Sequence, residues 1–199
     1  MANSPTHVRL CFEVEPFKAD TYSFQVHSST DISRIELLGN STLNDVSLLI
    51  GSLLNFNELP FNSKFVDALY KKEELALVGG LLFEQNNLTI AASCCADFQD
   101  WKVVASDIKR EASPWMGHNP TPWFDFDADK IIVWSDEDDR KNSYAIELTQ
   151  QEFAEQLEIA KQQMQGFLKI AEVWTIENYH TDPSKLVEGM RHYLFSDYS

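Results

Sequence analysis

One amphipathic segment in the C-terminal third of this 199-residue chain constrains its fold more than any other feature. Thr149 and Glu152 have the spacing of a capping box, in which each side chain bonds the other residue's backbone N–H, and this predicts a helix N-terminus. The helix, expected over about 150–174, carries apolar residues at intervals of three and four: Phe153, Leu157, Ala160, Met164, Phe167, Leu168, Ala171 and Trp174. Such a stripe must pack against another layer, and a sheet is the expected one.

The segments before this helix predict strands that pair through short turns. Residues 7–15 alternate apolar and polar side chains, residues 77–92 have the pattern of a hairpin with a polar turn at 85–87, and residues 124–148 that of a meander. Further strands are expected at 22–26, as an antiparallel neighbour of 7–15, and at 33–38; further helices are expected to start at Ser41, at Asn62 or Ser63, at Asp97 and at Asp182. The fold class is therefore α+β, with a mostly antiparallel sheet of hairpins and a meander packed against helices. No linker divides the chain, so one compact domain over 1–199 is expected.

The charge balance restricts the classes of partner. The chain has 31 acidic and 16 basic residues, a formal net charge of −15, and both halves share the excess. Such a field repels the phosphates of nucleic acids and anionic lipids and attracts basic protein surfaces. Direct nucleic-acid binding is not expected. The same acidity is also explained by solubility alone.

Cysteines and apolar runs indicate the compartment. Cys11, Cys94 and Cys95 cannot all pair internally, and a bond between adjacent cysteines closes a strained ring, so a reducing compartment is expected. Apolar windows are too short for a membrane span, and the N-terminus lacks a secretory pattern, which together predict a cytoplasmic protein.

The histidine and cysteine spacings match no zinc motif, and we expect neither a metal nor a cofactor.

The loop over residues 113–123 is the first candidate site. Its three prolines restrict the backbone, while Trp115, His118, Asn119 and Trp123 supply recognition groups. A preorganised aromatic loop loses little entropy on binding a partner. The alternative is a structural crossover whose tryptophan rings close the ends of the core.

An acidic segment after this loop is the second candidate site, with these carboxylates: Asp125, Asp127, Asp129, Asp136, Glu137, Asp138 and Asp139. The alternating aspartates are similar to the start of a calcium loop, but Lys130 stands where that loop requires glycine, so no metal is assigned. If the first three aspartates lie on an extended strand, they share one face opposite Phe124 and Phe126. The alternatives are an electronegative face for a basic protein and a solvated turn.

No nucleophile, phosphate-binding or dinucleotide motif is present, and the leading hypothesis is therefore an acidic protein-binding module. In size and charge the chain resembles immunity proteins, which neutralise basic toxins or nucleases, although no motif is shared. One alternative is a hydrolase or transferase with His118, Asn119 and nearby carboxylates in one cleft. Another is a homo-oligomeric scaffold subunit that pairs through the apolar surface of its two C-terminal helices.

Overall fold

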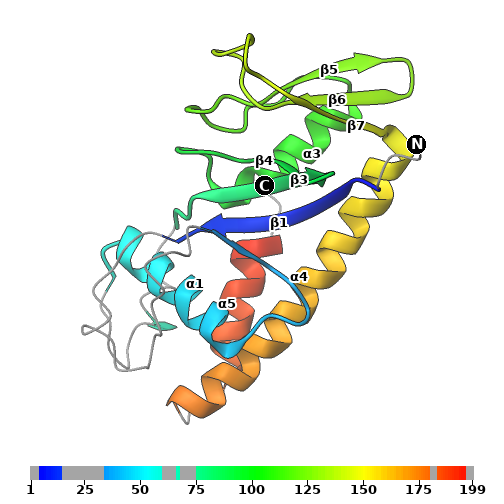
Figure 1. The fold of residues 1–199 in the computed structure, drawn as a ribbon. Helices are drawn as coiled ribbons and strands as arrows, with labels where there is room; N and C mark the ends of the chain where they lie inside the picture. The colour runs from blue at the N-terminus through cyan, green and yellow to red at the C-terminus, as the bar shows by residue number, and fades with distance from the viewer. Residues whose placement is uncertain (1–4, 15–33, 60–65, 68–74, 180–182, 196–199) are drawn as a thin grey trace. The chain divides into compact units, whose positions relative to one another are not determined.

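The computed structural model describes residues 5–14, 34–59, 66–67, 75–179 and 183–195 (Figure 1). The chain falls into two compact units, each built from two separate stretches. Unit 1 comprises Met1–Cys11 and Val78–Lys161, and unit 2 comprises Phe12–Leu77 and Gln162–Ser199. The expectation of one domain over 1–199 stays a prediction.

Two antiparallel sheets confirm the predicted α+β class. The first has the strand order β2-β1-β3-β4, and the second has the order β5-β6-β7. Their strands are β1 (His7–Glu13), β2 (Arg34–Glu36), β3 (Gly79–Gln85), β4 (Leu88–Ala91), β5 (Trp123–Asp127), β6 (Lys130–Trp134) and β7 (Ala145–Thr149). The β3–β4 turn has positive φ at both Asn86 and Asn87, which matches the twist of a tight hairpin.

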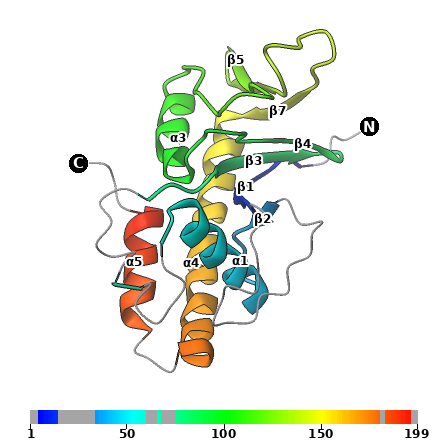
Figure 2. The same cartoon turned by 90° about the vertical axis from the view of Figure 1, so that its left-hand side faces the viewer.

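Unit 1 has its core around Phe83 on β3. The Phe83 ring meets Phe124 of β5 edge-on, with ring centroids 5.7 Å apart, and stacks with Phe153 at 6.3 Å. Phe153 belongs to helix α4 (Gln150–Tyr179). A 3-10 turn, η2 (Phe98–Asp100), leads into α3 (Trp101–Lys109), which lies beside β3 and β4 in both views (Figures 1 and 2). Phe153, the first residue of the predicted stripe, thus packs on a strand, as expected, and the next two, Leu157 and Ala160, are buried.

Unit 2 is mainly helical. Helix α1 (Leu43–Phe56), helix α5 (Ser184–Phe195) and the C-terminal half of α4 lie side by side (Figure 2). Trp174 is fully buried and its indole N–H donates to the Ser47 hydroxyl at 2.7 Å. At Gly166 of α4 the backbone approaches Gly39 so closely that an added Cβ would lie 2.6 Å from the Gly39 Cα.

Some predicted boundaries differ from the structure. Helix α1 is capped by Thr42, with a capping box to Asp45, because the expected cap Ser41 uses its hydroxyl to bond the Leu38 N–H and the Glu36 carbonyl. Helix α4 begins as predicted, with the Thr149–Glu152 capping box, but runs to Tyr179, beyond the predicted end. Asp97 caps the 3-10 turn before α3.

Other expectations fall on residues that the structure leaves undescribed. The strand expected at 22–26, the N-cap at Asp182 and most of the helix expected from Asn62 or Ser63 lie outside the described residues. None of the helices in the described ranges is long and apolar enough to cross a lipid bilayer.

Candidate functional site

All residues of the two predicted candidate sites lie in unit 1, in the loop 113–123 and in the β5–β7 meander with its 135–144 connection. Between residues 113 and 149 the chain carries eight acidic and three basic side chains, a net charge of −5. The excess negative charge of unit 1 is thus concentrated in this stretch of sequence.

The loop is held by the segment that follows β4. The Ser93 N–H donates to the Met116 carbonyl at 2.8 Å, and the Ser93 hydroxyl lies 2.7 Å from the Pro120 carbonyl. The His118 N–H returns a bond to the Cys94 carbonyl at 3.3 Å. Serine 93 is buried, so these bonds replace water at groups that would otherwise be unsatisfied.

Gly117 makes this docking sterically feasible. Its φ of +97° is one that side-chain-bearing residues rarely adopt. A Cβ at this position would lie 2.5 Å from the Ser93 hydroxyl oxygen and 2.7 Å from each of the Ser93 and Cys94 carbonyl oxygens. The backbone of the loop can therefore touch the 93–94 segment only with glycine at 117.

The four recognition residues of the loop differ in exposure. Trp115 is 52% exposed, and His118 and Asn119 are exposed, whereas Met116 is 1% exposed and fills the core beneath them. Met116 thus closes the core beneath the loop. Trp115 does not, although the structural-crossover alternative expected its ring to do so. The Trp115 ring lies 6.2 Å from the His118 ring, so the two form one exposed aromatic surface.

Trp123 is half-buried in a stack. Its indole lies nearly parallel to that of Trp134, with an interplanar angle of 7° and centroids 5.2 Å apart. On the same indole the Arg140 guanidinium lies 5.1 Å from the ring centroid, within the range of a cation–π interaction. Trp123 therefore already contacts an aromatic ring and a cation of its own chain.

Strand β5 has the predicted alternation. Phe124 is buried and Phe126 half-buried, while Asp125 and Asp127 are exposed on the opposite face. Asp125 accepts a hydrogen bond from the Trp134 indole at 2.9 Å. Asp129 is also exposed but lies in the β5–β6 turn, so it does not continue the strand face.

The carboxylates of the 135–144 connection organise backbone as well as carrying charge. Asp136 accepts from the N–H groups of Thr121 and Asp138, both at 3.1 Å, and Asp138 accepts from the Thr121 hydroxyl at 2.9 Å. Glu137 pairs with Arg140 at 2.7 Å, and Asp139 accepts two bonds from the Asn142 amide. The bonds of Asp136 and Asp138 with Thr121 hold this segment against the 113–123 loop. The alternative of a solvated turn therefore describes only the rest of the segment.

A hollow of about 230 Å³ opens beside this connection. Its lining combines two carboxylates with hydroxyl, amide and apolar groups: Thr89, Ile90, Ala91, Pro120, Ser135, Asp136, Asp139, Asn142, Ser143 and Tyr144. Sites that enclose drug-sized molecules have about 300–1,000 Å³, so this hollow suits a single side chain. His118 and Asn119 are not among the lining residues, so the structure does not place them with these carboxylates in one cleft.

A second group of polar side chains surrounds the loop tip. The ligand atoms of Cys94, Cys95 and His118 all lie within 4.8 Å of one another, and the Cys94 thiol donates to the His118 carbonyl at 2.7 Å. Desolvation raises the pKa of the Cys95 thiol above its ordinary value, and the neighbouring Cys94 thiol adds to the rise through a hydrogen bond and charge repulsion. Sequence spacing missed this group because His118 follows the two cysteines by more than twenty residues.

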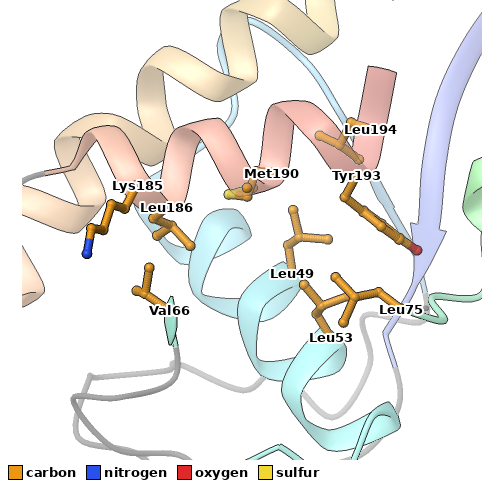
Figure 3. A pocket seen from close by; sticks show the side chains of 10 residues that line it. Leu49, Leu53, Val66, Leu75, Lys185, Leu186, Met190, Tyr193 and Leu194 are labelled. Carbon is orange, nitrogen blue, oxygen red and sulfur yellow. The ribbon is translucent and has the colours of Figure 1, made fainter. Parts of the chain in front are cut away.

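Unit 2 contains a separate apolar pocket. Side chains from α1 and α5, including Leu49, Leu53, Met190 and Tyr193, converge on it in Figure 3. Its free volume is about 30 Å³, room for one or two water molecules and too little for an organic ligand. We therefore assign no ligand to this pocket.

Comparisons of the chain with protein-family models, with curated proteins and with solved structures give no match.

Proposed function

We propose that this protein is an acidic binding module that holds a basic protein through the loop 113–123 and the 135–144 connection of unit 1. The observation that carries the proposal is the hollow lined by Asp136 and Asp139, which fits one lysine or arginine side chain. A cation that enters it would meet two carboxylates whose positions are already fixed by hydrogen bonds. Preorganised partners of this kind lose little entropy on binding.

Other exposed groups of unit 1 support association with a basic surface. The side-chain carboxylates of Asp127 and Asp129 have no hydrogen-bond or ion-pair partner in the described part of the chain, so their charges act on solvent and on approaching molecules. Charge of this kind raises association rates, whereas buried aromatic anchors slow dissociation. Trp115 is the exposed ring available as such an anchor.

The stack on Trp123 supports the proposal by analogy within the chain. Arg140 lies over the indole and also pairs with Glu137, so one guanidinium contacts a ring and a carboxylate together. An arginine or lysine of a partner can make the same ring contact at the exposed Trp115 and the same contact with a carboxylate in the hollow. A neutralising role of the immunity type, in a reducing cytoplasm that keeps the three cysteines as thiols, belongs to this proposal.

The two alternatives receive less support from the geometry. The enzyme hypothesis needs His118 beside carboxylates in one cleft, and the hollow is lined without it. The scaffold hypothesis needs an apolar stripe open to a second copy, but the side chains from Phe153 to Trp174 on that stripe are buried within the chain. Val173 and Ile176 remain exposed on α4.

The test compares two variants of equal net charge. The site variant changes Asp127, Asp129 and Asp139 to Asn, and the matched control changes the exposed Glu172, Glu177 and Glu188 to Gln. A basic protein captured from lysate of the source organism and released by salt would be purified, and its association with each variant followed by stopped-flow mixing at low and high salt.

We expect the site variant to associate about tenfold more slowly at low salt, with a smaller difference at high salt, while the control stays close to the wild type. In addition, Trp115→Ala should weaken binding by about 2 kcal/mol, or thirtyfold, through faster dissociation. Equal slowing by both charge variants would mean that only net charge matters, and it would refute the proposed site. Capture of no basic partner would refute the proposed function.

A further inference from the structure

Cys94, Cys95 and His118 form a group that does not line the hollow proposed to hold a basic side chain. It combines two thiols and an imidazole, and it is the one group of three or more His, Cys, Asp and Glu side chains close enough to share an ion within the described ranges. We propose that these three residues bind a zinc ion, with the fourth coordination position open to solvent. This proposal is independent of whether the protein has a basic partner.

Distances between the donor atoms fit this assignment. Zinc–sulfur and zinc–nitrogen bonds of about 2.3 and 2.0 Å place the donors of a tetrahedral site roughly 3.5–3.8 Å apart. The two thiol sulfurs and the imidazole nitrogen of this group lie within 4.8 Å of one another. Each pair therefore needs to close by little more than about 1 Å, which a small rotation of exposed side chains supplies.

The backbone explains how adjacent cysteines can face one ion. In an extended chain successive side chains point to opposite sides, so two neighbouring thiols would diverge. Cys95 instead has a φ of +68°, an uncommon conformation for a residue with a side chain. Backbone strain of this kind concentrates at functional sites. Here it accompanies two thiols on the side from which His118 approaches.

The docked 113–123 loop positions His118 beside the two cysteines. The contacts of Ser93 with the carbonyls of Met116 and Pro120, together with the bond from the His118 N–H to Cys94, fix the loop against the cysteines. Gly117 permits the close approach. The donor set thus comes from two segments that are already joined before any ion binds, which lowers the entropy cost of binding.

The chemistry of the donors selects the ion. Thiolate and imidazole ligands favour zinc over magnesium and calcium, which prefer oxygen ligands. Binding replaces the protons of the two thiols, so that one zinc ion enters as two protons leave and no oxidation occurs. Cys95 and His118 are exposed and Cys94 is half-buried, so an ion can enter from solvent and keep an open position.

The experiment uses cobalt as a spectroscopic probe for the zinc site. The whole chain, reduced with a phosphine that does not bind metals strongly, is titrated with Co²⁺ without oxygen and then with Zn²⁺. We expect one equivalent of cobalt to give thiolate-to-cobalt absorption in the near ultraviolet and visible bands of tetrahedral cobalt. Zinc should abolish both, and a competing chelator then gives the zinc affinity.

Single variants assign the ligands. Cys94→Ser, Cys95→Ser and His118→Ala should each weaken zinc binding by at least about tenfold, because even residues that only support a ligand cost ten- to hundredfold. The exposed His7 offers a matched control, and His7→Ala should bind as the wild type does. Circular dichroism of each variant checks that it has folded.

A measurement on the unaltered chain avoids dependence on variants. Bound zinc should protect Cys94 and Cys95 from alkylation, read by mass spectrometry of the peptides, while the buried Cys11 reports the intactness of the fold. Absence of the charge-transfer absorption, equal affinity of His118→Ala and wild type, or unprotected cysteines in zinc would each overturn the proposal.

Discussion

The docking of the 113–123 loop predicts a large effect from the smallest possible substitution, Gly117→Ala. If the loop stays docked, the alanine must hold a φ near +97°, which costs about 1–3 kcal/mol, and its Cβ must displace the Ser93 oxygen 2.5 Å away, which costs about 1–3 kcal/mol more. The docked variant therefore loses about 2–6 kcal/mol.

Alternatively, the variant avoids the clash if the 113–123 loop separates from the 93–94 segment, and this separation also costs free energy. It would break at least four hydrogen bonds: those from Ser93 to the Met116 and Pro120 carbonyls, and the two that join Cys94 and His118, each worth about 0.5–1.5 kcal/mol. It would also expose Met116, whose burial contributes about 1.5–3 kcal/mol. Because this sum is about 3.5–9 kcal/mol, both outcomes are destabilising, and the variant should lose at least about 2 kcal/mol.

Thermal unfolding followed by circular dichroism measures this loss. At about 2–4 °C per kcal/mol for a chain of this size, the melting temperature should fall by at least about 4 °C. The matched control is Gly189→Ala inside α5, where the same change should be neutral or stabilising by up to about 1 kcal/mol. A Gly117→Ala variant as stable as the wild type would refute the account of the loop, and one that melts early but keeps its zinc affinity would show that docking does not position His118.

Three further substitutions test separate parts of the structure. Asp136→Ala removes the acceptor of the Thr121 N–H and should cost about 1–2 kcal/mol in urea unfolding, and no loss would mean that this carboxylate is free in solution. Gly166→Ala should destabilise by about 1–3 kcal/mol although alanine favours helices, because its Cβ meets the Gly39 backbone; a higher melting temperature would contradict that contact. Burial raises the pKa of Asp100, so the folded state holds the proton more tightly than the unfolded state does, and the free energy of unfolding falls as the pH rises through the folded pKa. Asp100→Asn should therefore raise the melting temperature at neutral pH but not at a pH below the ordinary Asp pKa. An equal gain at both pH values would refute this effect of burial on Asp100.

Local patterns in the sequence were sufficient for most elements of unit 1. The capping box at Thr149, the hairpin turn at Asn86 and Asn87 and the alternation of β5 each act within a few residues, so the sequence carries them directly. The start of α1 was misplaced by one residue because Ser41 and Thr42 are both good caps. The bonds of the Ser41 hydroxyl with the Leu38 N–H and the Glu36 carbonyl, together with the Thr42–Asp45 capping box, decide between them.

The sequence supplies the candidate residues but does not predict which of them lie together. Trp115, His118 and the carboxylates were found from composition, whereas the approach of Cys94 and Cys95 to His118 depends on a loop that docks by backbone hydrogen bonds. Such bonds are made by backbone N–H and carbonyl groups, which every kind of residue offers in much the same way, so no side-chain pattern predicts them. The glycine at 117 was the available signal, and its meaning follows only once its neighbours are known.

The contact between Gly39 and Gly166 also limits how the sequence can evolve. Gly39 donates its N–H to the Gln163 side chain at 2.7 Å, so the turn before α1 is fixed to the same face of α4 that lacks a side chain at 166. A substitution at 166 must therefore arise after the turn has shifted, and a change of the turn would first have to abandon Gln163. In descendants of this sequence the three positions should change as a set or remain as they are.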